Sequence, residues 1–146
     1  ISGHPVVDVK VELFFGSFHS VDSSEMAFKI AASQAIQEGV PQAQPCVLEP
    51  VLEVEVTVPE DAMGDVTGDL NSKRGRILGM DTAGPGRQRI NAHVPEAELL
   101  RYGAELRSLT AGRGIYTAKP SHYDVLPDHL AKGLMEQYTA NRAEGH

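Results

Sequence analysis

A chain of 146 residues is long enough for one domain, or two small ones, with a buried core, and its 41% hydrophobic and 23% charged residues exclude a disordered protein. The net charge of −7 argues against a protein that coats nucleic acid non-specifically, because such binding requires neutralised phosphates. No apolar run reaches the roughly 20 residues of a membrane span, and the first residues lack an export signal. The one cysteine, Cys46, can form no internal disulfide, which favours a reducing, cytoplasmic setting.

The first predicted elements are a strand and a helix. Apolar and polar residues alternate over 7–15, a period-two pattern that predicts a half-buried strand. Two acids with capping-box spacing then open a helix predicted over 22–38, and Gly39 is expected to stop it. Residues 41–45 form a connector and a candidate boundary.

A second strand and helix follow the connector. Alternation from Leu48 predicts a long strand, with Leu48, Leu52, Val54, Val56 and Val58 on one face. Pro59 opens a helix that has acids in its first turn and the apolar stripe Met63, Val66 and Leu70. The triplet 73–75 closes this helix.

The next segment predicts a hairpin, a helix and a short strand. Residues 77–82 and 88–94 form strands around a turn-rich loop, with Ile90, Ala92 and Val94 facing inward. A helix over 95–112 carries the stripe Leu99, Tyr102 or Gly103, Leu106 and Leu109, and a strand follows at 115–119. This order is the ferredoxin-like βαββαβ pattern, which predicts an antiparallel sheet with both helices on one face.

A terminal helix is predicted from Pro127, with Leu130, Leu134 and Tyr138 spaced by four and fraying from Thr139. We interpret 144–146 as the stub of an expression tag. The predicted fold class is α+β, with domains at 1–47, 48–125 and 126–146.

The sequence lacks the motifs of several common catalytic and ligand-binding sites. The nearest approach to a phosphate-binding P-loop, over 68–73, has lysine where the second glycine belongs and lies inside a predicted helix. The six histidines lack metal-ligand spacing, and helix N-termini explain the grouped acids. We therefore expect no catalytic residue, no metal site and no cofactor in this chain.

Two glycine-containing loops are candidate RNA contacts. The loop 16–20 carries Phe18 and His19, whose rings can stack on unpaired bases, and we expect His19 to be exposed. In the loop 110–114, an arginine between two glycines can approach a phosphate closely. Residues 73–113 also contain eight basic and four acidic residues. Simple turns and ordinary solvated charge are the competing interpretations.

Long motifs resemble the translation elongation factor G family. The run 6–29, with Gly-Ser-Phe-His-Ser-Val-Asp-Ser-Ser-Glu, resembles the late fourth domain of that family. The motifs 54–60, 68–75 and 106–114, and the pair His122-Tyr123, resemble its fifth domain. Together they extend over nearly all of residues 4–138.

The resemblance implies a partial βαβ unit of the fourth domain, which is ribosomal S5 domain 2-like, then a ferredoxin-like fifth domain and a C-terminal helix. It also implies the ribosome- and tRNA-contacting end of a cytoplasmic translational GTPase that promotes tRNA–mRNA translocation. The GTPase domain, with its GTP and magnesium, would lie elsewhere in the parent. The expected partners are ribosomal RNA and proteins and the tRNA–mRNA pair, with no membrane and a monomeric state.

Site residues follow from the same resemblance. The tip residues expected to contact tRNA at the decoding site are Gly16, Ser17, Phe18, His19, Ser20 and Asp22, among which His19 matches a tip histidine of the family. The residues expected to contact ribosomal RNA are Lys73, Arg74, Arg76 and Arg113.

The tip also departs from the family pattern. Phe14-Phe15 stands where the family usually has Tyr-Asp, Phe18 replaces a tyrosine, and Ser20 replaces a common acid. The alternatives left open are a specialised elongation factor G-like factor in ribosome recycling or protection, a stand-alone RNA-binding module and a small α+β enzyme.

Overall fold

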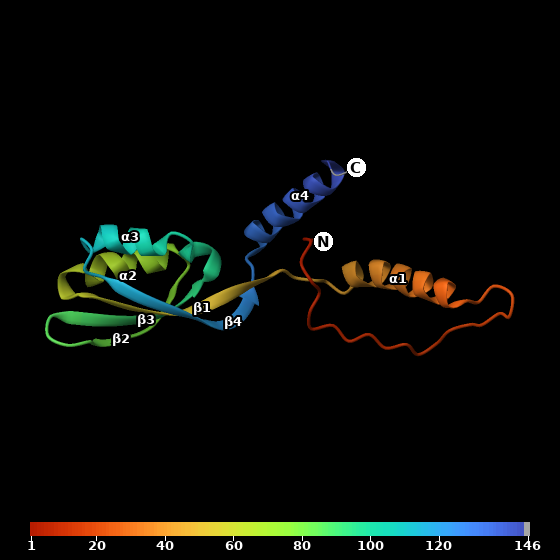
Figure 1. Cartoon of the computed structure of the whole chain (residues 1–146), viewed down its shortest axis with the longest axis horizontal. Helices are drawn as coiled ribbons and strands as arrows, with labels where there is room; N and C mark the ends of the chain where they lie inside the picture. Colours follow the sequence, from red (N-terminus) through yellow and green to blue (C-terminus); the bar gives the residue numbers. More distant parts are fainter. Residues whose placement is uncertain (145–146) are drawn as a thin grey trace. The chain divides into compact units, whose positions relative to one another are not determined.

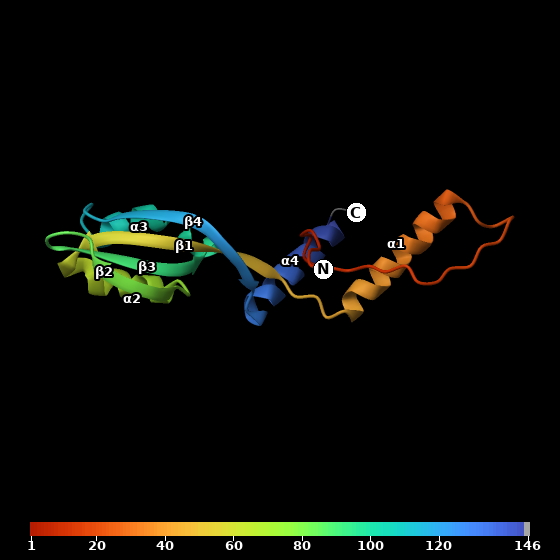
Figure 2. The ribbon, with the colours of Figure 1, turned by 90° about the horizontal axis from the view of Figure 1, so that it is seen from below.

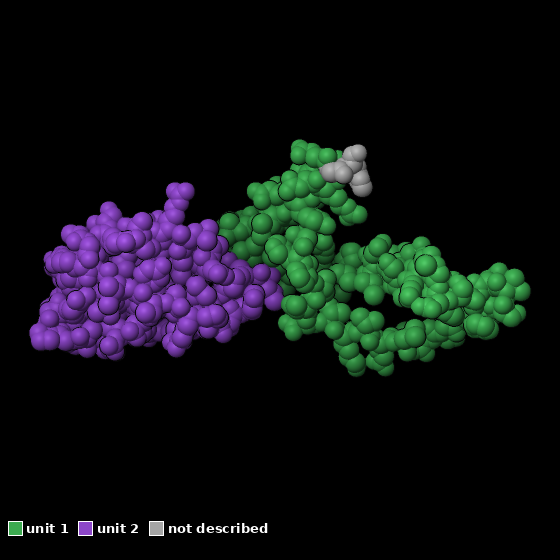
Figure 3. Space-filling view, in the orientation of Figure 1, with its two compact units in different colours: residues 1–47, 126–146 green, residues 48–125 purple. Residues whose placement is uncertain are grey.

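The computed structural model describes residues 1–144 and divides into two compact units (Figures 1 and 3). One unit comprises residues 48–125. The other comprises residues 1–47 and the segment from Leu126 onward. The end of the suspected tag stub, residues 145–146, lies outside the described residues.

Residues 48–125 form a four-stranded antiparallel sheet with the order β2-β3-β1-β4. The strands are β1 (Leu48–Pro59), β2 (Arg76–Thr82), β3 (Arg87–Pro95) and β4 (Ile115–Val125). The first strand is central because β3 and β4 pair with its two edges. This is the ferredoxin-like arrangement that the element order predicted, and the prediction is confirmed.

Two helices cover one face of this sheet, also as predicted (Figures 1 and 2). They are α2 (Met63–Ser72), preceded by the short 3-10 helix η1 (Glu60–Ala62), and α3 (Tyr102–Leu109), preceded by η2 (Glu96–Leu99). The core between sheet and helices contains Val54, Val56, Val58, Val66, Leu70, Ile90, Ala92, Val94, Tyr102 and Leu106. The apolar stripes of α2 and α3 thus pack against the apolar face of the sheet, and this contact removes both surfaces from water.

The prediction of a single helix over 95–112 is wrong in two respects. It is divided into η2 and α3, with Arg101 in a non-helical conformation between them. Leu109 is also exposed, because the buried stripe continues from Leu106 to Thr110, four residues later.

The last strand is longer than predicted. β4 continues past Lys119 to Val125, although Pro120 lies within it. Proline is tolerated there because β4 is an edge strand and needs no backbone donor on its outer side. Val51 pairs with His122 and Leu52 with Pro120, so Ser121 is left as the extra residue of a β-bulge.

The strand predicted over 7–15 is wrong. These residues have no regular secondary structure and are exposed, and Figure 1 shows them as an extended trace. A strand needs a neighbouring strand for its N–H and C=O groups, and residues 1–47 contain none in the structure.

The helix α1 (Glu25–Gln42) is shifted from its predicted position. Its N-cap is Ser24, and it passes through Gly39 without stopping. Gly39 lies inside the helix and does not have a positive φ, and the first residue after Gly39 in the left-handed region is Gln44, beyond the helix end. No residue of α1 is buried.

The terminal helix α4 (Asp128–Glu144) begins where predicted. The expected fraying from Thr139 is wrong, since the helix continues to Glu144. The Thr139 hydroxyl donates to the Met135 carbonyl at 2.9 Å within this last part.

Candidate functional site

The turn before α1 holds the residues predicted to contact tRNA. Ser23 closes this turn, because its N–H donates to the His19 carbonyl at 2.9 Å and its hydroxyl accepts from the His19 N–H at 2.8 Å. The Ser24 hydroxyl then accepts from the Ala27 N–H at 3.1 Å and caps α1. The backbone of His19 is therefore fixed, while its side chain is exposed.

Phe18 lies beside this turn and is held by α1. Its ring stacks on that of Phe28, with centroids 6.5 Å apart and an interplanar angle of 11°. Phe18 nevertheless remains 69% exposed. The other predicted tip residues, Gly16, Ser17, Ser20 and Asp22, are exposed along the same turn. The structure thus places the six predicted tip residues on one continuous surface segment.

Lys73 is held in an ion-pair cluster at the end of α2. Its Nζ lies 2.7 Å from Glu105 of α3 and 3.4 Å from Asp69 of α2, and its side chain is only 14% exposed. The hydrogen bond to Glu105 is the main cause that raises the pKa of the Lys73 amino group. Lys73 therefore links the two helices.

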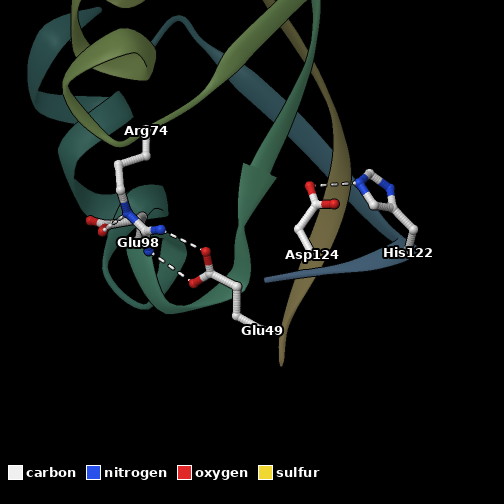
Figure 4. A network of polar contacts seen from close by, with 5 residues as sticks. All are labelled: Glu49, Arg74, Glu98, His122 and Asp124. Atoms are coloured by element: carbon white, nitrogen blue, oxygen red, sulfur yellow. Dashed lines mark hydrogen bonds and ion pairs between the residues drawn. The ribbon is translucent and has the colours of Figure 1, made fainter. Parts of the chain in front are cut away.

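Arg74 forms a second cluster just beyond α2 (Figure 4). Its Nη1 and Nη2 donate to the two carboxylate oxygens of Glu49 at 2.6 and 3.0 Å, and its Nε donates to Glu98 at 3.0 Å. Glu49 is 8% exposed, so this bidentate pair compensates a buried charge. The Glu49 hydrogen bond is the main cause that raises the pKa of the Arg74 guanidinium.

The backbone of Arg74 also ends the helix. Its φ is +58°, its N–H donates to the Asn71 carbonyl at 3.2 Å, and the Gly75 N–H donates to the Leu70 carbonyl at 2.9 Å. These two bonds make a Schellman motif, in which the left-handed position usually belongs to glycine. An arginine occupies it here, and its side chain joins three elements.

Arg113 is paired as well. Its Nη2 lies 3.1 Å from Asp61, and its Nε donates to the Thr110 carbonyl at 3.1 Å. Its own carbonyl accepts from Arg87 at 3.0 Å. The loop that carries Arg113 therefore closes the end of α3 and contacts η1, just before α2, a structural role that sequence reasoning missed.

The four predicted basic residues do not form one patch. Lys73, Arg74 and Arg76 follow the last residue of α2, whereas Arg113 lies beside Asp61, just before α2 begins. The ten residues of α2 separate the two places by about 15 Å at 1.5 Å per residue. Among residues 1–144, Arg76 is the one member of the four without an ion pair, and it is exposed.

A polar network on the other face of the sheet was not predicted as a unit. His93 of β3 and His122 of β4 meet edge to face, with centroids 5.0 Å apart. The Ser121 hydroxyl lies 2.8 Å from His122 Nδ1 and 3.4 Å from His93 Nε2. Figure 4 shows the contact between His122 and Asp124, in which His122 Nε2 lies 3.1 Å from the Asp124 carboxylate. The alternation of β3 predicted that His93 faces away from the core, but the bulge at Ser121 has no signal in the sequence.

Comparison with known protein families shows to which family this chain belongs. The family model for elongation factor G, domain IV matches residues 1–44, and the model for the elongation factor G C-terminus matches residues 46–134. The second match alone spans more than half of the chain. The chain belongs to the elongation factor G family.

The chain is also similar to a solved structure. A crystal structure of a protein from Thermus thermophilus is similar, with 43% sequence identity and a TM-score of 0.73. The match covers 86% of this chain and 19% of the Thermus chain. This chain thus spans about one fifth of the length of that solved relative.

The two family matches separate the candidate residues of the chain into two groups. All tip residues lie within the domain IV match, and all four basic residues lie within the C-terminus match. Residues 1–144 contain no group of three or more His, Cys, Asp or Glu side chains placed to hold a metal ion. No helix in this part of the chain is both long and apolar enough to cross a membrane.

Proposed function

We propose that this chain is the ribosome-facing end of a longer, cytoplasmic translational GTPase that promotes movement of the tRNA–mRNA pair. In this proposal the turn 16–22 enters the decoding region. The observation that carries it is the state of His19, whose backbone is fixed by Ser23 while its imidazole is exposed. The family membership of residues 1–44 supports the assignment.

The proposed mechanism is mechanical. A fixed turn can occupy the space that a tRNA has left and thereby oppose its return, and it requires no bond making in this chain. An imidazole can donate to or accept from RNA hydroxyl and phosphate groups, so His19 would strengthen the contact at the moved position. GTP hydrolysis in another domain of the parent would supply the free energy.

Contact with ribosomal RNA is assigned mainly to Arg76. An unpaired, exposed arginine can bind phosphate without first losing an internal partner. If Lys73 or Arg74 turned to bind a phosphate, the carboxylates that now pair with it would be left without a cation. Arg113 would likewise have to release Asp61. Replacement of Arg76 by glutamine should make the log–log salt dependence of ribosome binding shallower by about 0.7 to 0.9. An unchanged slope would remove Arg76 from the interface.

The decisive experiment replaces His19 by alanine in the full-length parent. We expect slower tRNA–mRNA movement in a single-turnover assay, with ribosome-stimulated GTP hydrolysis retained. His129→Ala, at an exposed position of α4, is the matched control and should leave both rates unchanged.

Other outcomes lead to the alternatives. If His19→Ala slows separation of the ribosomal subunits but not movement, a recycling factor is the better assignment. If it abolishes GTP hydrolysis first, or if His129→Ala has an equal effect, the proposed role of the tip is wrong.

A further inference from the structure

His93 and His122 come from different strands but share the face of the sheet that the helices leave open. His93 of β3 pairs with Glu53 of β1, and His122 of β4 pairs with Val51 of β1. Strand side chains alternate with a period of two, and Val54 belongs to the core under the helices, so positions 51 and 53 face the other way. Their two partners lie on that open face, where the rings meet with centroids 5.0 Å apart.

The β-bulge adds a hydroxyl group to these two rings. In a regular strand, the neighbouring side chains of Ser121 and His122 would point to opposite faces. Ser121 is the extra residue of the bulge and has no partner on β1, which allows its side chain to point to the same face as His122. Its hydroxyl lies 2.8 Å from His122 Nδ1 and 3.4 Å from His93 Nε2, and the residue is exposed.

The distances assign the protons of this network. His122 Nε2 lies 3.1 Å from the Asp124 carboxylate, which only accepts, so Nε2 of the neutral ring carries the proton (Figure 4). His122 Nδ1 then holds a lone pair and accepts from the Ser121 O–H. That hydroxyl has one proton to donate, so the longer contact is one in which His93 Nε2–H donates to Ser121 Oγ.

Each of the four side chains thereby matches one role in nucleophilic chemistry. A serine hydroxyl becomes nucleophilic when a neighbouring base takes its proton, and a third group orients that base. His122 Nδ1 is placed as the base, and Asp124 is the positioning residue that orients its ring. An N–H donor beside the nucleophile can bind the oxyanion that forms on the substrate, and His93 Nε2 supplies one.

We propose that Ser121 is a site of covalent acylation that takes an acyl group from small activated esters or thioesters. Ser121 Oγ attacks the carbonyl carbon, and its proton passes to His122 Nδ1, where Asp124 stabilises the imidazolium. The carbonyl oxygen becomes an oxyanion that accepts from His93 Nε2–H. When the carbonyl re-forms, its bond to the alcohol or thiol breaks, and this leaving group takes the proton from His122. The products are acyl-Ser121 and the free alcohol or thiol. The site is independent of the proposed function of the tip.

Acetylation of the 146-residue chain tests the proposal. The probe is 4-nitrophenyl acetate, and peptide mass spectrometry locates the acetyl group, which separates Ser121 from other nucleophiles such as the exposed Cys46. Ser121 should be acetylated close to completion under conditions in which Ser108, an exposed serine of α3, stays unmodified. No excess at Ser121 over Ser108 would overturn the proposal.

Histidine variants identify the base and the donor. His122→Gln should lower the rate of Ser121 acetylation by about 100-fold, the lower end of the range for a general base. His93→Phe keeps an aromatic ring and removes the N–H donor, and it should lower the rate by a smaller factor. His129→Gln, at an exposed position of α4, is the matched control and should leave the rate unchanged. If His122→Gln has no larger effect than His129→Gln, the proposal is wrong.

Nuclear magnetic resonance tests the network without any reagent. Long-range proton–nitrogen spectra of the unmodified chain should show that neutral His122 and neutral His93 both carry the proton on Nε2. Asp124→Asn should shift His122 toward the Nδ1–H tautomer, because an amide can donate to Nε2, and should slow Ser121 acetylation with it. A merely structural Asp124 would not couple these two readouts. An Nδ1–H tautomer of His122 in the unmodified chain would overturn the proposal even if every variant failed to fold.

Discussion

Residues 7–15 and residues 48–58 share one sequence pattern and differ completely in structure. Both alternate apolar and polar side chains. Val54 is fully buried in the central strand β1, whereas Leu13 is 91% exposed in an irregular segment. The difference is that β1 lies between β3 and β4 and under two helices, while 7–15 has no paired strand. Alternation thus sets which side chains would share a face, and pairing decides whether a strand forms.

The helices of the two units differ in the same way. α1 has 18 residues and a serine cap but buries none of its side chains. α2 has ten residues and no side-chain cap, yet Val66 and Leu70 are fully buried. Local signals suffice to begin a helix, but burial against a sheet is what ties α2 to the stability of its unit.

The largest expected effect comes from the core. Leu70→Ala should lower the free energy of unfolding by about 2–5 kcal/mol, because it leaves a cavity between α2 and the sheet. The matched change Leu13→Ala should alter it by less than about 0.5 kcal/mol. Urea unfolding followed by circular dichroism gives both values, and equal effects would show that 7–15 is packed in solution.

The second-largest expected effect on the free energy of unfolding comes from the Arg74 cluster. Arg74→Ala leaves Glu49 buried without its cation and should cost about 2–3 kcal/mol. Arg74→Gly should cost about 1 kcal/mol less, since glycine adopts a positive φ without strain. Arg76→Ala is the control at an exposed neighbour and should be nearly neutral. If the three variants unfold alike in urea, Arg74 does not stabilise this unit.

Alkaline pH should weaken the core through Tyr102. Burial raises the pKa of the Tyr102 phenol above its ordinary value of 10, and its hydroxyl has no hydrogen-bond partner among residues 1–144. Stability is therefore full below pH 10 and falls as the unfolded chain ionises, by up to about 1.4 kcal/mol per pH unit. The raised pKa of Lys73 acts in the same direction.

The contribution of Tyr102 can be isolated. Tyr102→Phe should show a shallower loss of stability above pH 10 than the unmodified chain, with little change at neutral pH. In absorbance titration, one tyrosine of the unmodified chain should ionise only on unfolding. Ionisation of all four tyrosines before unfolding would mean that Tyr102 is accessible.

The smallest effect is expected at the tip. His19→Ala should change the free energy of unfolding by no more than about 0.5 kcal/mol, because the backbone bonds of the turn to Ser23 remain. Ser23→Ala should disturb the turn more, and amide hydrogen exchange at residue 19 would report it. Strong destabilisation by His19→Ala would make that residue structural rather than a contact.

The tip and the four basic positions could be named from sequence because long motifs carry them. Their environments could not. Arg74 and Glu49 are far apart in the chain and meet only because β1 begins beside the end of α2. Pairing of this kind depends on long-range geometry, so an arginine that is structural and one that is free have the same appearance in sequence.

By itself the sequence determined the order of elements in residues 48–125, the inward faces of β1 and β3, and the family. These are encoded locally, in side-chain periodicity and contiguous motifs. Only the tertiary structure decided that 7–15 is not a strand, that β4 passes a proline and bulges at Ser121, and that the candidate cations fall at two ends of α2. Each of these depends on which backbone or carboxylate lies alongside, a condition set by segments distant in the chain.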